Sequence, residues 1–159
     1  MKIARAMKEI ARLKGEIKDL KHRTQSCLSV IDGSPFNEIF EDLYATLKDR
    51  LNKVSSLKNA IVCANVAHDM HRYIITLGEL KSYLDFLKEF ELKSGVQESR
   101  YSDSHNTYVS QVSIKEKNTA IQETQQEINR ITDILDEFNA KTDIGETKEI
   151  VLNLPKIKD

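Results

Sequence analysis

The first thirty residues carry a heptad pattern of apolar side chains, and this pattern limits the fold more than any other feature of the chain. One line of residues recurs at alternating steps of three and four: Ile3, Ala6, Ile10, Leu13, Ile17 and Leu20, followed by Thr24, Cys27 and Ile31. Such steps bring side chains to one face of an α-helix. The alternation of isoleucine and leucine favours packing against one further helix, which another subunit or a hairpin partner in the same chain would supply equally well.

A second helix is predicted after a turn at DGSPFN (Asp32–Asn37), where Asp, Gly, Ser and Pro stand together. The apolar spacing then resumes at once, at Phe36, Phe40, Leu43, Leu47, Val54, Leu57, Ile61 and Ala64. A tight turn makes the two helices an antiparallel hairpin.

The second half of the chain contains two capping-box patterns, each of which predicts the start of a helix. Thr76–Glu79 begins a third helix that buries Leu77, Leu80, Leu84, Leu87 and Phe90 before Ser94-Gly95, and Ser113–Glu116 begins a last helix that buries Ile114, Ile121, Ile128, Ile131, Leu135 and Phe138. Between them, a polar loop leads to a β-prone run over 108–112, which we expect to pair as a strand with Arg72–Ile75.

These elements predict a mainly α fold, an antiparallel bundle of about four long helices with a small β-hairpin-like element at one end. The composition agrees, since 31% of residues are charged, 6% are aromatic, and there are only 5 Gly and 2 Pro. We expect one domain over residues 1–145 and a tail over 146–159. The β-prone run Ile150–Leu152 either joins the small sheet or stays disordered.

Charge and hydropathy limit the partners and the location of the protein. The 24 basic and 25 acidic residues leave a net charge of −1, so neither nucleic acid nor a membrane is expected as a partner. The first helix is richer in Lys and Arg, and we interpret this as a solvated face that would suit an acidic partner helix. No window is apolar enough for a membrane span, which predicts a cytoplasmic protein whose Cys27 and Cys63 are buried free thiols.

The segment HDMH is the densest cluster of residues that could bind a metal. His68 and His71 share a face if the helix continues, and with Asp69 they would hold a divalent transition metal, which is the one cofactor the sequence suggests. A further ligand could come from Cys63, His105 or a neighbouring subunit. The alternative is that HDMH is an ordinary solvated connection.

A second candidate site is Arg100, Tyr101 and Ser102, whose guanidinium and hydroxyl groups would donate hydrogen bonds to an anion. The alternative is that Arg100 pairs with a helix carboxylate while Tyr101 covers the end of the bundle. The sequence contains no G-x-S-x-G, phosphate-binding glycine loop, H-E-x-x-H or CxxC motif, so no specific catalytic signature is present.

The order of the elements, together with NAIVCAN at the end of the second helix, RYS at Arg100–Ser102, Val112 and EFNAKT at the end of the last helix, resembles a small bacterial helical family. Some members of that family are labelled septicolysin. The resemblance covers about residues 2–143 and implies a helical protein that forms homo-oligomers and has no firmly established activity. The label would imply a pore-forming cytolysin, for which the sequence offers neither an export signal nor an amphipathic hairpin suited to a lipid-facing barrel.

Our leading hypothesis is a homo-oligomeric assembly or scaffold protein that acts through helix contacts rather than catalysis. The seam residues Ile3, Ile10, Leu13, Ile17 and Leu20 would carry the contacts, because the apolar seams are long for a chain of 159 residues. The alternative is a metal-dependent or anion-dependent enzyme or sensor with its site at the bundle end.

Overall fold

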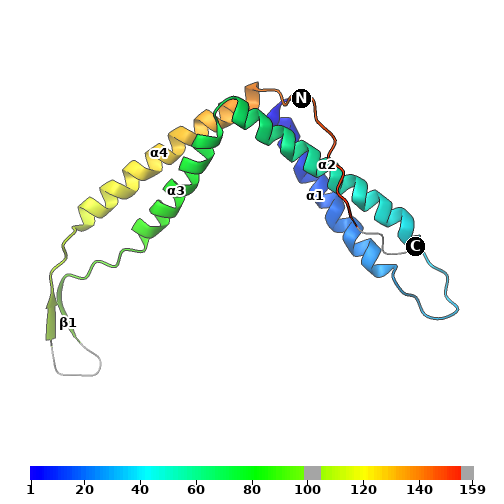
Figure 1. Ribbon diagram of the computed structural model, residues 1–159. Helices are drawn as coiled ribbons and strands as arrows, with labels where there is room; N and C mark the ends of the chain where they lie inside the picture. The colour runs from blue at the N-terminus through cyan, green and yellow to red at the C-terminus, as the bar shows by residue number, and fades with distance from the viewer. Residues whose placement is uncertain (99–104, 155–159) are drawn as a thin grey trace. The chain divides into compact units, whose positions relative to one another are not determined.

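The computed structural model describes residues 1–98 and 105–154, and the fold is mainly α-helical. The elements are α1 (Ile3–Ser26), α2 (Phe40–Ala67), α3 (His71–Lys88), β1 (Gly95–Glu98), β2 (His105–Tyr108) and α4 (Ile114–Lys141), in that order (Figure 1). The predicted fold class, four helices with a small β element, is therefore confirmed. No helix in the described ranges combines the length and the apolar character that crossing a membrane requires.

The chain divides into two compact units, and the single domain over residues 1–145 stays a prediction. The first unit comprises Met1–His71 and the segment from Asp136 onward, and the second comprises Arg72–Leu135. We describe each unit by itself.

The first unit is built on the hairpin of α1 and α2, which lie side by side (Figure 1). The apolar lines of the two helices meet in one core, made of Ile3, Ala6, Ile10, Leu13, Ile17, Leu20, Leu43, Leu47, Val54, Leu57, Ala60 and Ala64, with Ile144 from the tail. The heptad seam of the first helix thus finds its partner within the same chain. This burial, rather than capping, supports the helices, because neither Lys2 nor Ile39 makes a side-chain cap.

The connection between α1 and α2 is longer than the sequence indicated. At the end of α1 the hydroxyls of Thr24 and Ser26 donate to carbonyl oxygens four residues back, at 2.7 and 2.9 Å. A turn follows at Gly33, whose φ of 82° favours glycine. Ile31 and Phe36, predicted to belong to the seams, are instead exposed by 83% and 64%.

The C-terminal tail follows α2 in an extended conformation. It begins beside the N-terminus, where the amide of Ile144 donates to the carbonyl of Met1 at 2.8 Å. Farther along, Ser56 Oγ accepts from the amide of Ile150 at 2.8 Å, and Asn52 Oδ1 accepts from that of Leu152 at 2.9 Å. Side chains of α2 thus accept hydrogen bonds from the tail backbone at these two positions.

The second unit is a hairpin of α3 and α4 with a two-stranded antiparallel sheet in the connection (Figure 1). Lys117, near the start of α4, donates to the carbonyl of Lys88 at the end of α3 at 3.2 Å, so the two helices run antiparallel. The strands pair from Gly95 opposite Tyr108 to Glu98 opposite His105. The buried residues of α3 and α4 are Leu84, Leu87, Thr124, Ile128 and Ile131.

The predicted strand pairing and the start of the third helix were wrong. Arg72–Ile75 lies inside α3, which begins at His71. Of the predicted strand over 108–112 only Tyr108 is in a strand, at the end of β2, which pairs with β1 instead. Thr76–Glu79 is interior to the helix, so its capping-box pattern caps nothing. Helical packing overrides the β propensity of this short apolar run, since such propensity depends on context.

The second capping box is confirmed. Ser113 Oγ accepts from the amide of Glu116 at 3.1 Å, and the Glu116 carboxylate accepts from the amide of Ser113 at 2.8 Å. These bonds hold the pKa of Glu116 below its usual value. Helix α4 begins at Ile114, although the Ile114 side chain, predicted to be buried, is exposed.

Candidate functional site

The predicted metal-binding segment forms the C-terminal cap of α2. The amides of Asp69 and Met70 donate to the carbonyls of Val66 and Asn65 at 3.1 and 2.8 Å. These two bonds are the Schellman arrangement, in which the residue after the cap adopts a left-handed conformation. Asp69 takes that place with a φ of 57°, a conformation that Asp tolerates better than most residues. The backbone conformation of this turn therefore explains the aspartate at position 69, without a role in metal binding.

Of the three candidate metal ligands in this segment, only Asp69 and His71 lie close to each other. Asp69 and His71 lie 3.8 Å apart, whereas the ring of His68 packs edge-on against Phe138 with 5.4 Å between centroids. Within residues 1–98 and 105–154, no group of three or more His, Cys, Asp or Glu side chains is arranged to hold a metal ion. Metal binding by His68, Asp69 and His71 stays a prediction.

His68 borders a groove between the end of α2 and the tail. The groove has a volume of about 600 Å³ and is lined by Asn59, Ala60, Cys63, Ala64, Ala67, His68, Asp143, Gly145, Glu146 and Lys148. Its acidic residue Asp143 already pairs with Lys2 at 2.7 Å and with the N-terminal amine at 3.2 Å, which holds the pKa of Asp143 below its usual value. The sequence pattern could not reveal this groove, because the tail residues lie far from α2 in sequence.

The other predicted site residues lie in three different settings. Arg100, Tyr101 and Ser102 fall outside the described residues, so their anion site stays a prediction. His105 stands in β2. Both cysteines are free thiols, but neither is buried as predicted, since Cys27 is half-buried and Cys63 is exposed.

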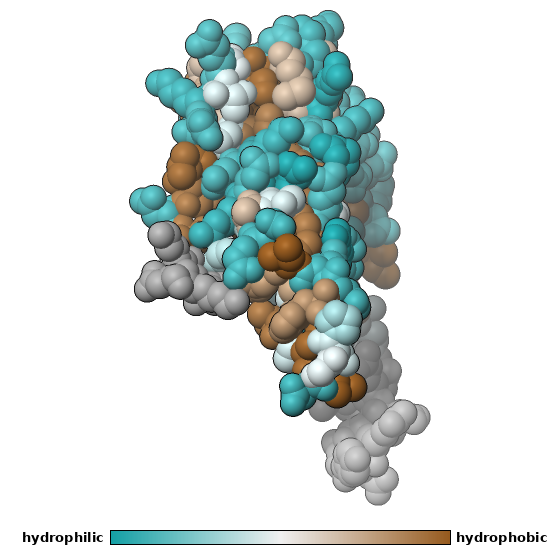
Figure 2. All heavy atoms as spheres, turned by 90° about the vertical axis from the view of Figure 1, so that its right-hand side faces the viewer, coloured by the Kyte–Doolittle hydropathy of each residue, from teal (hydrophilic) through white to brown (hydrophobic). Residues whose placement is uncertain are grey.

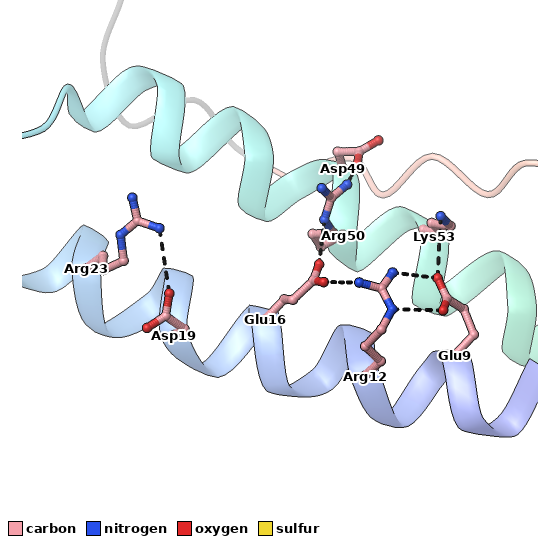
Figure 3. Close-up of polar contacts among 8 residues, drawn as sticks. All are labelled: Glu9, Arg12, Glu16, Asp19, Arg23, Asp49, Arg50 and Lys53. Atoms are coloured by element: carbon pink, nitrogen blue, oxygen red, sulfur yellow. Dashed lines mark hydrogen bonds and ion pairs between the residues drawn. The ribbon is translucent and has the colours of Figure 1, made fainter.

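An ion-pair network joins α1 to α2 along one side of their core (Figure 3). Arg12 pairs with Glu9 and Glu16 on its own helix, and Arg50 of α2 reaches Glu16 at 2.9 Å. The hydrogen bonds from Arg12 lower the pKa of Glu9 to about 2, and those carboxylates raise the pKa of Arg12. The groups are at least partly exposed to solvent, so water and salt screen each pair and its contribution to stability is small. The network lies beside the core that α1 and α2 share.

A cluster of aromatic rings lies at the end of α3, and the sequence analysis missed it, because it assigned Phe90 to the core and gave Tyr83 and Phe86 no role. Tyr83 and Phe86 have ring centroids 6.3 Å apart, and Phe86 meets Phe90, two residues beyond the helix, edge-on at 4.8 Å. Tyr83 and Phe86 are 49% and 56% exposed. The spacing of three and four residues between these aromatics was the available signal, because it places them on one face beside Leu84 and Leu87.

The connection between α1 and α2 carries a second exposed apolar region. Figure 2 shows brown and pale side chains gathered over this connection, toward the lower end of the visible face. A hollow of about 250 Å³ there is lined by Cys27, Leu28, Phe36, Glu38, Ile39, Phe40 and Glu41. Arg23 pairs with Glu38 and holds the connection against α1.

Comparison with known proteins gives a family but no activity. A model described as a family of unknown function (DUF6847) matches residues 11–144, which is most of the chain, so the chain belongs to that family. No curated protein and no solved structure matches the chain. The family match carries no septicolysin label, and that part of the resemblance stays a prediction.

Proposed function

We propose that this member of the family of unknown function is an assembly protein, which associates with further copies of itself through helix contacts. The aromatic cluster of Tyr83, Phe86 and Phe90, in which Tyr83 and Phe86 are exposed and Phe90 is half-buried, is the single observation that supports this proposal most. Contiguous exposed apolar surface rimmed by polar residues commonly marks a protein interaction site. Aromatic residues are also the side chains that most often dominate the energy of an interface.

The proposed contact surface differs from the seam suggested by the sequence. Ile3, Ile10, Leu13, Ile17 and Leu20 are all buried in the core that α1 shares with α2. A second copy could reach them only if this hairpin opened. We therefore place self-association on α3, where large apolar side chains are already exposed.

The test compares two charged substitutions on the same helix by native mass spectrometry of the untagged full chain. Phe86→Glu should weaken association by about 2 kcal/mol or more, which is roughly a thirtyfold rise in the dissociation constant. Ile74→Glu is the matched control, because Ile74 is also exposed but lies on another side of α3. A wild-type protein that is monomeric at high micromolar concentration would contradict the proposal.

A metal-dependent enzyme or sensor is the second candidate, supported by the groove in which His68 and Cys63 stand together. The same native mass spectra test it, because one bound transition metal adds a fixed mass to each subunit. His68→Ala should remove that mass, while His22→Ala on exposed α1 should leave it unchanged. Protein purified without chelator that carries no added mass would count against this candidate.

A further inference from the structure

Helix α1 presents three lines of side chains along its length, since successive residues turn by about 100°. The first line is the buried seam. The second carries the ion-pair network that faces Arg50 and Lys53 of α2, and its members are Glu9, Arg12, Glu16, Asp19 and Arg23 (Figure 3). The third, on the other side of the seam, consists of Met7, Ala11, Lys14, Lys18, Lys21 and Gln25. All acidic residues of α1 thus fall on the second line.

The third line contains three lysines without an acidic neighbour. Lys14, Lys18 and Lys21 are exposed, and none of them forms an ion pair or side-chain hydrogen bond with any part of the chain that the structure describes. At 1.5 Å per residue they span about 10 Å along the helix. Like charges at this spacing repel each other by a few tenths of a kcal/mol in an isolated helix. An acidic surface placed against these lysines would attract them and so offset their mutual repulsion.

Helix α2 extends this surface with an apolar strip and one more lysine. Tyr44, Leu51 and Lys58 recur every seven residues, on the side of α2 away from Arg50 and Lys53, and Lys58 is exposed. We call Lys14, Lys18, Lys21 and Lys58 the basic flank. It adjoins partly buried Tyr44 and Leu51, so it offers apolar contact as well as charge.

The aromatic face of α3 has the complementary character. Glu79 lies on the same line as Phe86, and Asp85 and Glu89 form the neighbouring line, in which Glu89 follows Phe86 by three residues. All three carboxylates are exposed, and none is in an ion pair within residues 1–98 and 105–154. Lys81 and Lys88 lie four residues before and three residues after Asp85, so they border the acidic side chains on the side away from the aromatic cluster. We call Glu79, Asp85 and Glu89 the acidic edge of the aromatic cluster.

We propose that α3 of one copy docks against the basic flank of a second copy, with the acidic edge facing the lysines and the aromatic cluster against Tyr44 and Leu51. This inference rests on the proposed self-association and names the surface that receives α3. Charge complementarity selects the occupant, because one chain carries both an unpaired basic surface and an unpaired acidic, aromatic one. Two copies that each give α3 and receive the partner's α3 form a closed two-fold dimer.

The test is a charge-reversal complementation in the full chain, read as subunit number by native mass spectrometry and as a dissociation constant by ultracentrifugation. One variant carries Lys14→Glu, Lys18→Glu and Lys21→Glu, and the other carries Glu79→Lys, Asp85→Lys and Glu89→Lys. Each variant alone should associate at least about tenfold more weakly than wild type, because like charges then face each other in both contacts. In an equimolar mixture every contact is again between opposite charges, so mixed dimers should form near wild-type affinity.

Circular dichroism of each variant confirms folding, and a salt titration of wild-type protein provides a second measurement that needs no mutation. The proposed dimer should weaken as ionic strength rises, because its charges lie at the surface. If both variants still form wild-type oligomers while Phe86→Glu is monomeric, this docking surface is wrong and self-association stands. Variants that stay monomeric when mixed also overturn it. A monomeric wild-type protein overturns self-association itself.

Discussion

The two hairpins of this protein differ in how completely they bury their apolar side chains. In the α1–α2 hairpin, the apolar lines of both helices close on each other, and Ile3 and Leu13 are completely shielded from solvent. In the α3–α4 hairpin, the buried set is small, and Tyr83 and Phe86 on α3 remain about half exposed. The first hairpin therefore needs no partner for its seam, whereas the second displays apolar surface that an assembly would cover.

The two hairpins also differ in what starts their helices. Helices α1 and α2 lack a side-chain cap, and α1 is held instead by the tail, where the amide of Ile3 donates to the carbonyl of Thr142 at 2.9 Å. Helix α4 starts with a complete capping box at Ser113 and Glu116. The helices of the first hairpin are stabilised mainly by tertiary burial. In the second hairpin, local hydrogen bonds contribute a larger share of helix stability.

The largest expected effect comes from the core of the first hairpin. Leu13→Ala should lower the free energy of unfolding by about 2–5 kcal/mol, because it empties a fully enclosed site that two rigid helices cannot refill. Met7→Ala is the matched control on the exposed side of α1 and should change it by less than about 0.5 kcal/mol. Chemical denaturation measures both. A change below about 1 kcal/mol for Leu13→Ala would show that the seam is loosely packed.

The equivalent substitution in the second hairpin should cost less and stay local. Leu87→Ala is expected to lower stability by about 2 kcal/mol, the lower end for such a change, because fewer buried neighbours surround it and they can relax. Hydrogen exchange should show faster exchange of α3 amides while the amides of α1 keep their protection. If the amides of α1 and α3 lost protection equally, the two hairpins would unfold together, and the second would not be the less stable one.

Sequence patterns predicted the parts of this fold that depend on neighbours close in the chain. The seam around Leu13 and the cap at Ser113 were both recognisable, because each follows from spacing within one helix. The pattern at Thr76–Glu79 has the same letters as a capping box but lies inside α3. A capping box caps only where the preceding backbone leaves the helix, and residue types alone do not show that.

The candidate site was harder to predict because its features depend on burial and on distant segments. The sequence pattern placed Leu84 in the buried line, but it did not show that Phe86 on the same helix would be left exposed, because exposure depends on which face other segments cover. The bond between Ser56 and Ile150 joins residues 94 positions apart. At HDMH, the histidines suggested chemistry, whereas the backbone shows that Asp69 terminates α2.

Removal of the cap tests how far α4 depends on local bonds. Ser113→Ala should lower the free energy of unfolding by about 1 kcal/mol, within the range of about 0.5–2 kcal/mol for lost caps, since the amide of Glu116 loses its acceptor. Gln111→Ala, two residues before the cap in an exposed position, serves as the control. Thermal denaturation by circular dichroism measures the difference. Identical melting of both variants would mean that packing against α3 alone holds the start of α4.

The hydrogen bond between α2 and the tail should contribute somewhat less. Ser56→Ala removes the acceptor for the amide of Ile150 and should cost about 0.5–1.5 kcal/mol. Ser55→Ala changes the adjacent position, which faces another side of α2. Limited proteolysis should cut the tail sooner in Ser56→Ala than in Ser55→Ala. Equal cleavage rates would show that Asn52 and the burial of Ile144 suffice to hold the tail.

The smallest expected effect is the contribution of the ion-pair network of the first hairpin to stability, and it is measured as a pH dependence of the melting temperature. Arg12 lowers the pKa of Glu9 to about 2 from an ordinary value of 4.5, so the folded state prefers the charged carboxylate. The stabilisation is complete above pH 4.5 and is lost as the pH falls through about 2. Wild type should therefore melt slightly higher than Glu9→Gln near pH 7, and this gap should close between pH 4.5 and 2. A constant gap for Glu9→Gln over this pH range would mean that side-chain packing rather than charge supports the hairpin at this position.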